Sequence, residues 1–254
     1  MLTAITRKVS SALSHCELSF IPRQPIDLEK AREQHQAYED LLDKLGARVV
    51  SLPEEPELPD SMFVEDPAIV LDESAVICSL GSEARRKEAP LLAAALEKYR
   101  RLEHVKLPGT LEGGDVLRIG KKMFVGITKR SNPEGIRQLA VIVGRFGYEV
   151  TAVPVTGCLH LKSAVTYLGR NTLLGNRGWF DERRLPGFEW VDVDASEPHA
   201  GNALVLGDTV IFPASFPKTR EKIEAQGFKV ASLDISELQK AESGLTCSSL
   251  LFEA

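Results

Sequence analysis

The sequence lacks several features that would assign it to a class at once. No run of about 18 apolar residues occurs, so we expect no transmembrane helix. Residues 1–25 include Arg7, Glu17 and Arg23 but no apolar segment, so we expect no signal peptide and a cytoplasmic protein. The cysteines have no CxxC spacing, which favours reduced thiols. They are Cys16, Cys78, Cys158 and Cys247.

The charge balance and the glycine pattern exclude further classes. The net charge of -5 disfavours a nucleic-acid or anionic-membrane partner and suits a small cationic ligand better. Neither GxGxxG nor GxxxxGK[ST] occurs, so nothing supports a nucleotide-binding sheet. No linker or low-complexity stretch interrupts the chain, and we therefore expect a single domain over residues 1–254.

What the sequence does contain is one recurring pattern of a short apolar strand, a polar turn and a second apolar strand. The polar pairs between the strands are typical of hairpin turns. After each hairpin the apolar spacing predicts a helix and then another short strand. The four hairpins span residues 66–78, 115–126, 164–174 and 203–212.

The helices and closing strands of these units follow from caps and spacing. We expect helices from Pro90, from Asn132 and Pro133, over residues 178–184 and over residues 217–226. The strands that follow them are expected at residues 105–108, 150–154, 190–193 and 230–233. The N-terminal region supplies a fifth helix from the cap Asp27 to Gly46 and a strand at residues 48–53.

Two predicted strands, at residues 2–6 and 247–252, lack a hairpin partner of their own. Pairing them completes a fifth hairpin and removes two open sheet edges. Five such units predict a five-bladed α/β propeller, closed by the N- and C-terminal strands, with corresponding loops converging on its axis. An α/β sandwich of ordinary βα units is the alternative.

The polar residues most suited to chemistry lie in the loops before the hairpins. Cys247 and His160 are a candidate nucleophile and acid/base pair, because a neighbouring imidazole is a common activator of a thiol. The alternatives are a structural thiol, a core histidine, or half a metal site made by Cys158 and His160. No further Cys/His cluster completes a ligand set, so we expect no metal.

Carboxylates dominate two of these loops. Buried carboxylates need cations or donors, and a guanidinium matches them with two parallel hydrogen bonds. Glu112 precedes two glycines, whose small size would let it approach the axis closely. A solvated acidic turn and a plain bend are the alternatives. The first loop combines Phe63 with the carboxylates of Asp60, Glu65 and Asp66.

Two arginines, Arg85 and Arg130, each lie just beyond a hairpin and are candidates for gripping a carboxylate. A surface position is the alternative for each. With these residues the chain resembles the dimethylarginine dimethylaminohydrolases, members of the guanidino-modifying, or pentein, superfamily with a five-bladed α/β propeller fold. The matching stretches are residues 63–67, 111–115, 159–162, 217–222 and 245–250.

The resemblance implies hydrolysis of asymmetric dimethylarginine or monomethylarginine to citrulline, with release of dimethylamine or methylamine. It implies that Cys247 is the nucleophile, through an S-alkylthiouronium intermediate, that His160 is the general acid/base and that Glu112 orients and charges the site. Substrate binding would fall to Leu18 on a mobile lid, Asp60, Phe63, Glu65, Asp66, Arg85, Arg130 and Ser243.

Within that set, Asp66 would hold the guanidinium, and Arg85 with Arg130 would hold the α-carboxylate. The backbone of Leu18 would help to hold the α-amino group. The implied partner is a small guanidino amino acid, with no metal or organic cofactor, no nucleic acid and no membrane; a homodimer stays open. One departure is Ser243, since the family often has Asp-Gly where this chain has Glu242 and Ser243. A relative acting on arginine or agmatine, and a propeller that only binds, are the rival functions.

Overall fold

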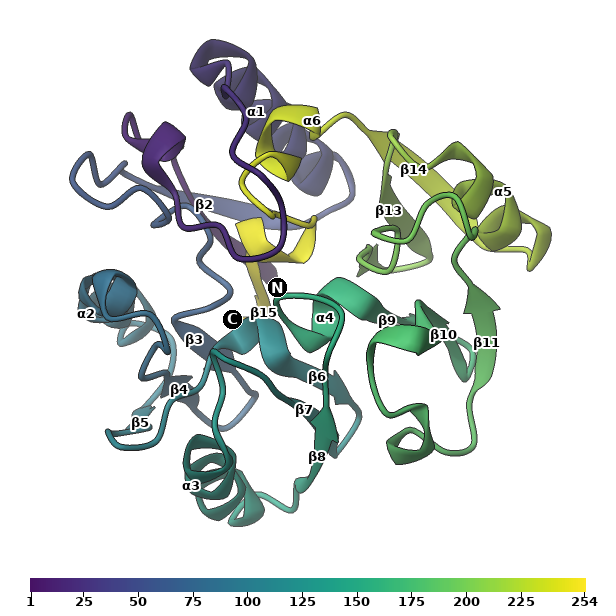
Figure 1. Ribbon diagram of the computed structural model, residues 1–254. Coiled ribbons are helices and arrows are strands. Elements are labelled where there is room, and N and C mark those ends of the chain that lie inside the picture. The colour runs from purple at the N-terminus through teal and green to yellow at the C-terminus, as the bar shows by residue number, and fades with distance from the viewer.

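The computed structural model describes all 254 residues and contains five separate three-stranded sheets. In each sheet the middle strand pairs antiparallel with one neighbour and parallel with the other. Figure 1 shows the sheets arranged around a common centre, with the longer helices on the outside. The prediction of a five-bladed α/β propeller is therefore confirmed.

The bounds of the elements follow the repeat. Four sheets comprise β3 (Ala68–Val70), β4 (Ala75–Ile77) and β5 (Leu102–His104); β6 (Val116–Ile119), β7 (Lys122–Ile127) and β8 (Glu149–Pro154); β9 (Val165–Gly169), β10 (Thr172–Gly175) and β11 (Glu189–Asp192); and β12 (Leu204–Leu206), β13 (Thr209–Pro213) and β14 (Lys229–Leu233). The fifth comprises β15 (Leu250–Glu253), β1 (Leu2–Arg7) and β2 (Arg48–Leu52).

The helices are α1 (Leu28–Lys44), α2 (Glu88–Leu96), α3 (Pro133–Gly144) and α5 (Pro217–Ala225), with the short α4 (Leu161–Ala164) and α6 (Ser236–Gln239). None of them combines the length and the apolar character that a membrane crossing requires.

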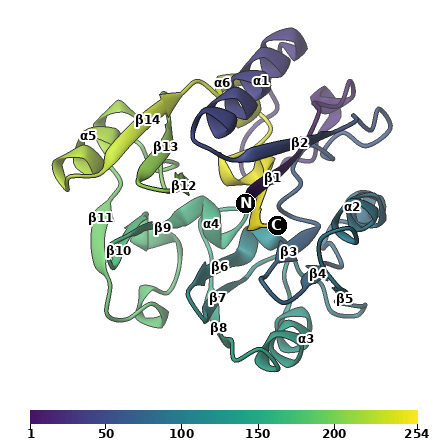
Figure 2. The same cartoon turned by 180° about the vertical axis from the view of Figure 1, so that it is seen from behind.

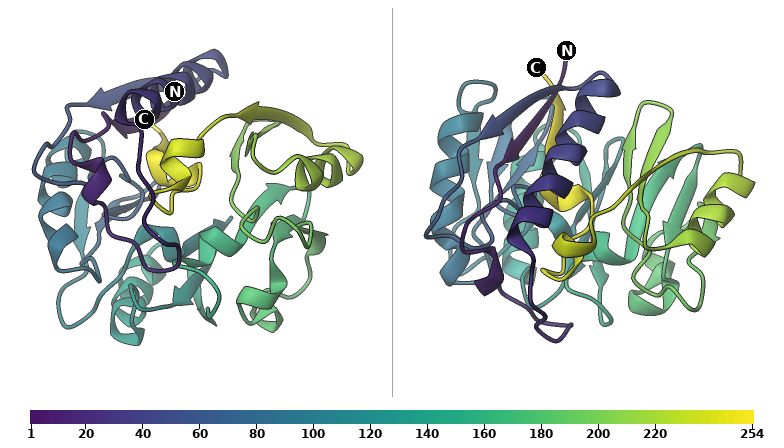
Figure 3. Two further views of the ribbon diagram at one scale, coloured as in Figure 1. Left: turned by 45° about the horizontal axis from the view of Figure 1, so that its top comes forward. Right: turned by 90° about the horizontal axis from the view of Figure 1, so that it is seen from above.

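The two ends of the chain meet in the fifth sheet, as predicted. Strand β1 pairs antiparallel with β15, with Ala4 opposite Leu251, and parallel with β2. Figure 2 shows the two termini side by side, and the right-hand view of Figure 3 shows them together at one end of the molecule. Strand β1 is thus paired on both sides and has no open edge.

The inner strands of all five sheets surround one central channel. Its volume is about 410 Å³, and β3, β6, β9, β12 and β15 each contribute residues to its wall. The loops that carry the candidate functional residues lie at one end of these inner strands. Figure 3 shows the N-terminal loop (purple) and the C-terminal loop (yellow) lying side by side at that end.

Local sequence explains why the helices cover the sheets as they do. In α3 the side chain of Asn132 accepts a hydrogen bond from the Gly135 N–H, and the buried face includes Ile136, Leu139 and Val143. In α1 the buried Tyr38 places its hydroxyl 2.6 Å from Ser249 Oγ. This contact ties the first helix to the segment that follows Cys247.

Several element predictions were wrong in detail. The strand expected at residues 105–108 is β5, Leu102–His104, because its partner β4 has only three residues and sets the pairing. The helix expected over residues 178–184 is two 3₁₀ turns, separated where Phe180 pairs with Val155. Helix α2 begins at Glu88, two residues before the predicted start at Pro90.

Candidate active site

A small closed cavity lies where the loops of the five units meet. Its volume is about 20 Å³, which is room for roughly one water molecule. Eight of the eleven predicted site residues line it, and Leu18, Glu65 and Glu112 do not. The lining consists of Glu17, Asp60, Phe63, Asp66, Arg85, Arg130, Leu159, His160, Ala241, Glu242, Ser243 and Cys247.

The pair of Glu112 and His160 forms the back of this cavity. Glu112 Oε2 lies 2.7 Å from His160 Nε2, and both side chains are buried. His160 caps the N-terminus of α4, whose first residue, Leu161, donates its N–H to Asp115 Oδ1 at 2.9 Å. Asp115 therefore fixes the backbone that carries the imidazole, while its own burial raises its pKa to about 6.

The charges of this pair support each other. Burial disfavours a charged His160, but Asp66 and the hydrogen bond to Glu112 outweigh it and raise its pKa to about 9. Burial likewise disfavours a charged Glu112, but the hydrogen bond to His160 outweighs it and lowers the pKa of Glu112 to about 2. At neutral pH the two groups form an imidazolium–carboxylate ion pair.

The glycines after Glu112 are needed for the close approach that the sequence predicted. A Cβ atom on Gly114 would lie 2.5 Å from His160 Nδ1 and 2.8 Å from Asp66 Oδ1. Asp66 Oδ1 itself lies 3.8 Å from His160 Nδ1. Only glycine at position 114 lets His160 and Asp66 lie this close to the backbone of this loop.

Asp66, Glu112 and His160 offer three ligand atoms within 4.8 Å of one another, a spacing that could hold a metal ion. The sequence did not predict a ligand set of this kind. Both carboxylates already bind guanidinium groups, however, because Asp66 contacts Arg85 and Glu112 contacts Arg130. The cluster is thus suited to planar organic cations as well as to metals.

Both predicted arginines lie in this site, and the surface alternative is wrong for each. Arg85 is 5% exposed; its Nη1 lies 2.7 Å from Asp66 Oδ2, and its other donors reach Glu88 at 2.9 and 3.0 Å. Arg130 is 8% exposed and lies 3.1 Å from Glu17 and 3.5 Å from Glu112. Sequence reasoning missed Glu17 and Glu88, since neither belongs to a motif.

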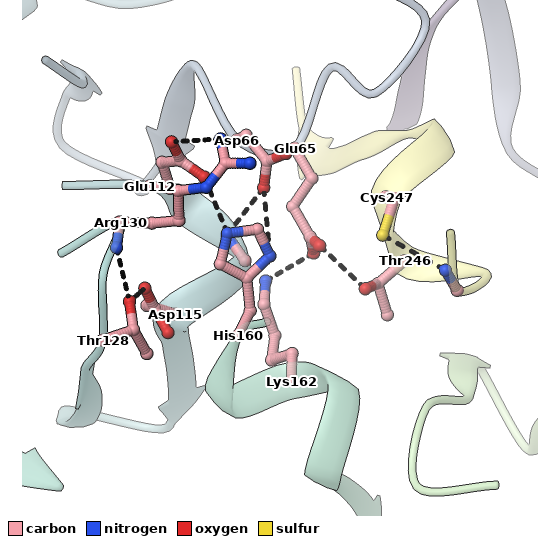
Figure 4. A network of polar contacts seen from close by, with 12 residues as sticks. Glu65, Asp66, Glu112, Asp115, Thr128, Arg130, His160, Lys162, Thr246 and Cys247 are labelled. Atoms are coloured by element: carbon pink, nitrogen blue, oxygen red, sulfur yellow. Dashed lines mark hydrogen bonds and ion pairs between the residues drawn. The ribbon is translucent and has the colours of Figure 1, made fainter. Parts of the chain in front are cut away.

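Two residues predicted to bind substrate face elsewhere. Glu65 forms an ion pair with Lys162 and accepts a hydrogen bond of 2.8 Å from Thr246, as Figure 4 shows, and these three residues line the central channel. Glu65 thus forms part of the wall of the central channel and does not line the small cavity. Leu18 packs against the N-terminal core, and its neighbour Glu17 enters the cavity instead.

Cys247 lies in a 3₁₀ turn, Thr246–Ser248, and not in the strand predicted for residues 247–252, which begins only at Leu250. Thr246 is bonded to Glu65 at 2.8 Å and to Asn202 at 3.0 Å, and these contacts hold the segment out of the sheet. Sequence reasoning could not foresee them because both partners lie in other units.

The thiol of Cys247 is protonated at neutral pH in this environment. Burial, together with the charges of Glu65 and Asp66, raises its pKa to about 12. The sulfur accepts a hydrogen bond of 3.4 Å from the Gly244 N–H and makes none with His160, although both line the same cavity. The predicted pair therefore shares a cavity but is not in hydrogen-bonded contact.

A loop of the N-terminal region, residues 16–26, covers the cavity and is called the lid segment below. Glu242 holds it: the carboxylate accepts hydrogen bonds from the backbone N–H groups of Ser19, Phe20 and Ile21. Glu242 itself has a left-handed backbone with φ of 57°. Its neighbour Ser243, the predicted departure from the family, lines the cavity with a hydroxyl that donates to Gly244 O at 2.9 Å.

Five α/β blades surround a partly buried cysteine and a buried histidine and carboxylate, and this arrangement defines a class of propeller. The family model of arginine deiminase matches residues 54–174. The chain is 34% identical over 228 residues to the N(G),N(G)-dimethylarginine dimethylaminohydrolase of Pseudomonas aeruginosa, covering 89% of this chain and 90% of that protein. The chain belongs to the dimethylarginine dimethylaminohydrolase family.

Two further comparisons agree. The protein of the same name from Streptomyces coelicolor is 36% identical over 249 residues, which cover 97% of this chain and 95% of that one. A solved structure of the Pseudomonas aeruginosa enzyme, a cysteine-to-serine variant in complex with citrulline, is similar with a TM-score of 0.92 at 31% identity. That match covers 99% of this chain and 100% of the solved one.

Proposed function

We propose that the protein is a C–N hydrolase that converts asymmetric dimethylarginine and monomethylarginine to citrulline and dimethylamine or methylamine. The observation that carries the proposal is that Asp66, His160 and Cys247 border one closed cavity, with Glu112 bonded to the histidine. The name shared by the relatives and the citrulline complex of the Pseudomonas aeruginosa enzyme support the same chemistry.

Asp66 is the proposed ligand of the substrate guanidinium. Support comes from its contact with Arg85 Nη1 at 2.7 Å, since the carboxylate already binds a guanidinium in that contact. Arg85 and Arg130 are the proposed ligands of the α-carboxylate, and Asp60, Phe63 and Ser243 complete the lining. A cavity of about 20 Å³ is far smaller than an arginine, so these side chains and the lid segment must move when substrate enters.

The first chemical step is attack by Cys247. A cationic guanidinium beside the sulfur offsets the neighbouring carboxylates that hold the pKa of the thiol high, so the thiol releases its proton to solvent and becomes the thiolate. The thiolate forms a bond to the guanidino carbon. His160 gives its proton to the methylated nitrogen, and the bond between that nitrogen and the carbon breaks. The amine leaves, and an S-alkylthiouronium group remains on Cys247.

The second step is hydrolysis of that intermediate. His160, now neutral, takes a proton from a water molecule as the water oxygen bonds to the same carbon. The carbon–sulfur bond breaks, the remaining hydroxyl proton passes to the sulfur, and citrulline is released. Glu112 stabilises the imidazolium of His160 before the first step and after the second, which supports its proposed role in orienting and charging the site.

The test is citrulline formation from asymmetric dimethylarginine, monomethylarginine and arginine, with the ureido product of agmatine followed in parallel. We expect turnover of the two methylated arginines to exceed that of arginine and agmatine. Cys247→Ala should keep the fold and lose turnover, whereas Cys78→Ala, which removes a buried thiol outside the cavity, should remain active.

Each other outcome has a definite meaning. Activity on arginine or agmatine alone would keep Cys247, His160 and Glu112 but replace the substrate. Full activity of Cys247→Ala would remove the proposed nucleophile. Product from none of the four compounds would overturn the hydrolase proposal and favour a binding role.

A further inference from the structure

The charged side chains around the catalytic cavity form ion pairs with one another. Asp66 and Glu88 bind the guanidinium of Arg85, and Glu17 binds that of Arg130. A zwitterionic amino acid with a guanidinium side chain presents the same two kinds of charge. Both of its charged ends therefore meet positions that side chains of the protein already fill.

The position beside Arg130 is filled by a carboxylate of the lid segment. Glu17 Oε2 lies 3.1 Å from Arg130 Nη2, and Glu17 Oε1 accepts a hydrogen bond of 2.6 Å from Ser82 Oγ. The backbone N–H of Glu17 also donates to the two carboxylate oxygens of Asp60, at 3.1 and 3.3 Å. The lid residue thus inserts its side chain into the cavity and is held there at three points.

Glu17 is also the main carboxylate partner of Arg130. The other one, Glu112, lies at 3.5 Å and has its second oxygen committed to His160 at 2.7 Å. The side chain of Glu17 is 34% exposed, whereas that of Glu112 is fully buried. Of these two carboxylates, only Glu17 can be exchanged with solvent or with a ligand without breaking the catalytic pair.

We propose that Glu17 is a tethered carboxylate that occupies Arg130 until the α-carboxylate of the substrate displaces it. This inference rests on the proposed function and adds a specificity residue to it. Displacement exchanges one carboxylate–guanidinium pair for another, so Arg130 contributes less to the binding of an amino acid than an unoccupied arginine would. It also frees Glu17 and with it one attachment of the lid segment.

The proposal predicts different behaviour for ligands with and without a carboxylate. An amino acid competes with Glu17, and its binding carries the cost of breaking the contact with Arg130. Agmatine has no carboxylate, leaves Glu17 in place and is attracted by its negative charge. A rival reading, in which Glu17 stays on Arg130 and binds the α-ammonium group, predicts the opposite effect of removing its charge on amino-acid binding.

The experiment compares Glu17→Gln with the wild type. Glutamine keeps the size and can still accept from Ser82, but it lacks the charge that competes for Arg130. Because Glu17 is partly exposed, its ion pair with Arg130 contributes modestly. We therefore expect the KM for asymmetric dimethylarginine to fall by about two- to fivefold, with kcat little changed. Inhibition by agmatine should stay the same or weaken.

A matched control is Glu73→Gln. Glu73 is a carboxylate of similar exposure, 30%, paired with Lys121 at 2.6 Å, and it does not line the cavity. Removal of its charge changes the net charge equally and should leave the KM for dimethylarginine and the inhibition by agmatine unaltered. A higher KM for dimethylarginine in Glu17→Gln, or a KM equal to that of the wild type, would overturn the proposal.

The proposed hydrolase function can fail independently. If the wild type turns over none of the guanidines, calorimetric binding of citrulline replaces KM as the measurement. Citrulline carries the same α-carboxylate, and Glu17→Gln should bind it more tightly than the wild type by a similar factor. Equal or weaker binding would reject the tethered carboxylate, whatever the reaction proves to be.

Discussion

Glu112 Oε2 and His160 Nε2 are 2.7 Å apart in a buried ion pair at the centre of the five sheets. The two residues come from different units, and each is held by its own loop: Glu112 accepts from the Gly81 N–H at 3.1 Å, and α4 carries the histidine. The pair keeps the imidazole protonated at neutral pH, and several consequences can be measured.

The first prediction concerns Glu112→Gln. The substitution keeps the shape of the side chain but removes the charge that helps to raise the pKa of His160 to about 9. That pKa should fall, so the alkaline limb of the pH profile of kcat should move to lower pH. Because His160 is the proposed acid, turnover at pH 8 should drop by about 10²-fold or more.

The control for that measurement is Glu39→Gln, which removes a buried carboxylate bonded to Thr6 and Ser51 outside the cavity. It should leave the pH profile where it is. An alkaline limb of Glu112→Gln that coincides with the wild type would mean that the pair does not set the protonation of the catalytic histidine.

The second prediction concerns the thiol. With its pKa near 12, Cys247 should react slowly with iodoacetamide at pH 8. Asp66→Asn removes one of the negative charges that raise this pKa, so the thiolate fraction and the alkylation rate should rise, by about tenfold for each unit of pKa. Mass spectrometry of the modified peptide assigns the reaction to Cys247.

Asp72→Asn serves as the comparison, because Asp72 is an exposed acid in the turn between β3 and β4. The alkylation rate of Cys247 in Asp72→Asn should equal that in the wild type. A slower reaction in Asp66→Asn than in the wild type would contradict the electrostatic account of the thiol.

The repeat explains why so much of the fold could be predicted. Hairpins, caps and helix spacing are local signals, and the two unpaired strands at residues 2–6 and 247–252 had only each other as partners. The ends of strands and turns that depend on a partner distant in sequence could not be predicted. Strand β5 ends where β4 ends, and the turn at Cys247 depends on the contacts of Thr246 with Glu65 and Asn202.

The candidate site shows the same division. Asp66, His160 and Cys247 lie in equivalent loops of three units, and equivalent loops of a propeller converge. The sequence therefore predicted that the three residues would share a cavity. Which side chain pairs with which was not predictable, since a carboxylate and an arginine have no sequence signature for each other. Glu65 forms an ion pair with Lys162, and Glu17 forms one with Arg130. Both ion pairs join residues of different units and exist only in the assembled fold.

The third prediction links the same ion pair to stability. The folded pKa of His160, about 9, lies above the ordinary value of 6.5. Its contribution is therefore fully present below pH 6.5 and is lost as the pH rises through 9. The difference of about 2.5 units corresponds to about 3 kcal/mol of unfolding free energy.

Urea unfolding at pH 6.5 and pH 9.5 measures this contribution. Between the two values the wild type should lose about 3 kcal/mol more than His160→Asn, in which the titrating group is absent. Groups that do not interact with His160 titrate in both proteins and cancel in the difference. Equal losses would show that the imidazolium does not stabilise the fold.

The fourth prediction concerns the hold of Glu242 on the lid segment. Its carboxylate accepts from the N–H groups of Ser19 at 3.0 Å and Ile21 at 2.8 Å, and its φ of 57° is strained for a residue with a side chain. Glu242→Gly removes the acceptor and relieves the backbone. Global stability should change by less than about 1 kcal/mol, because the two effects oppose each other.

Hydrogen exchange separates the two effects. In Glu242→Gly the amides of residues 19–21 lose their acceptor and should exchange about tenfold faster or more, while the five sheets keep their protection. Glu221→Gly, at an exposed position of α5, should leave those amides unchanged. Unaltered exchange at residues 19–21 in Glu242→Gly would mean that other contacts, such as those of Glu17 with Arg130 and Asp60, hold the lid segment.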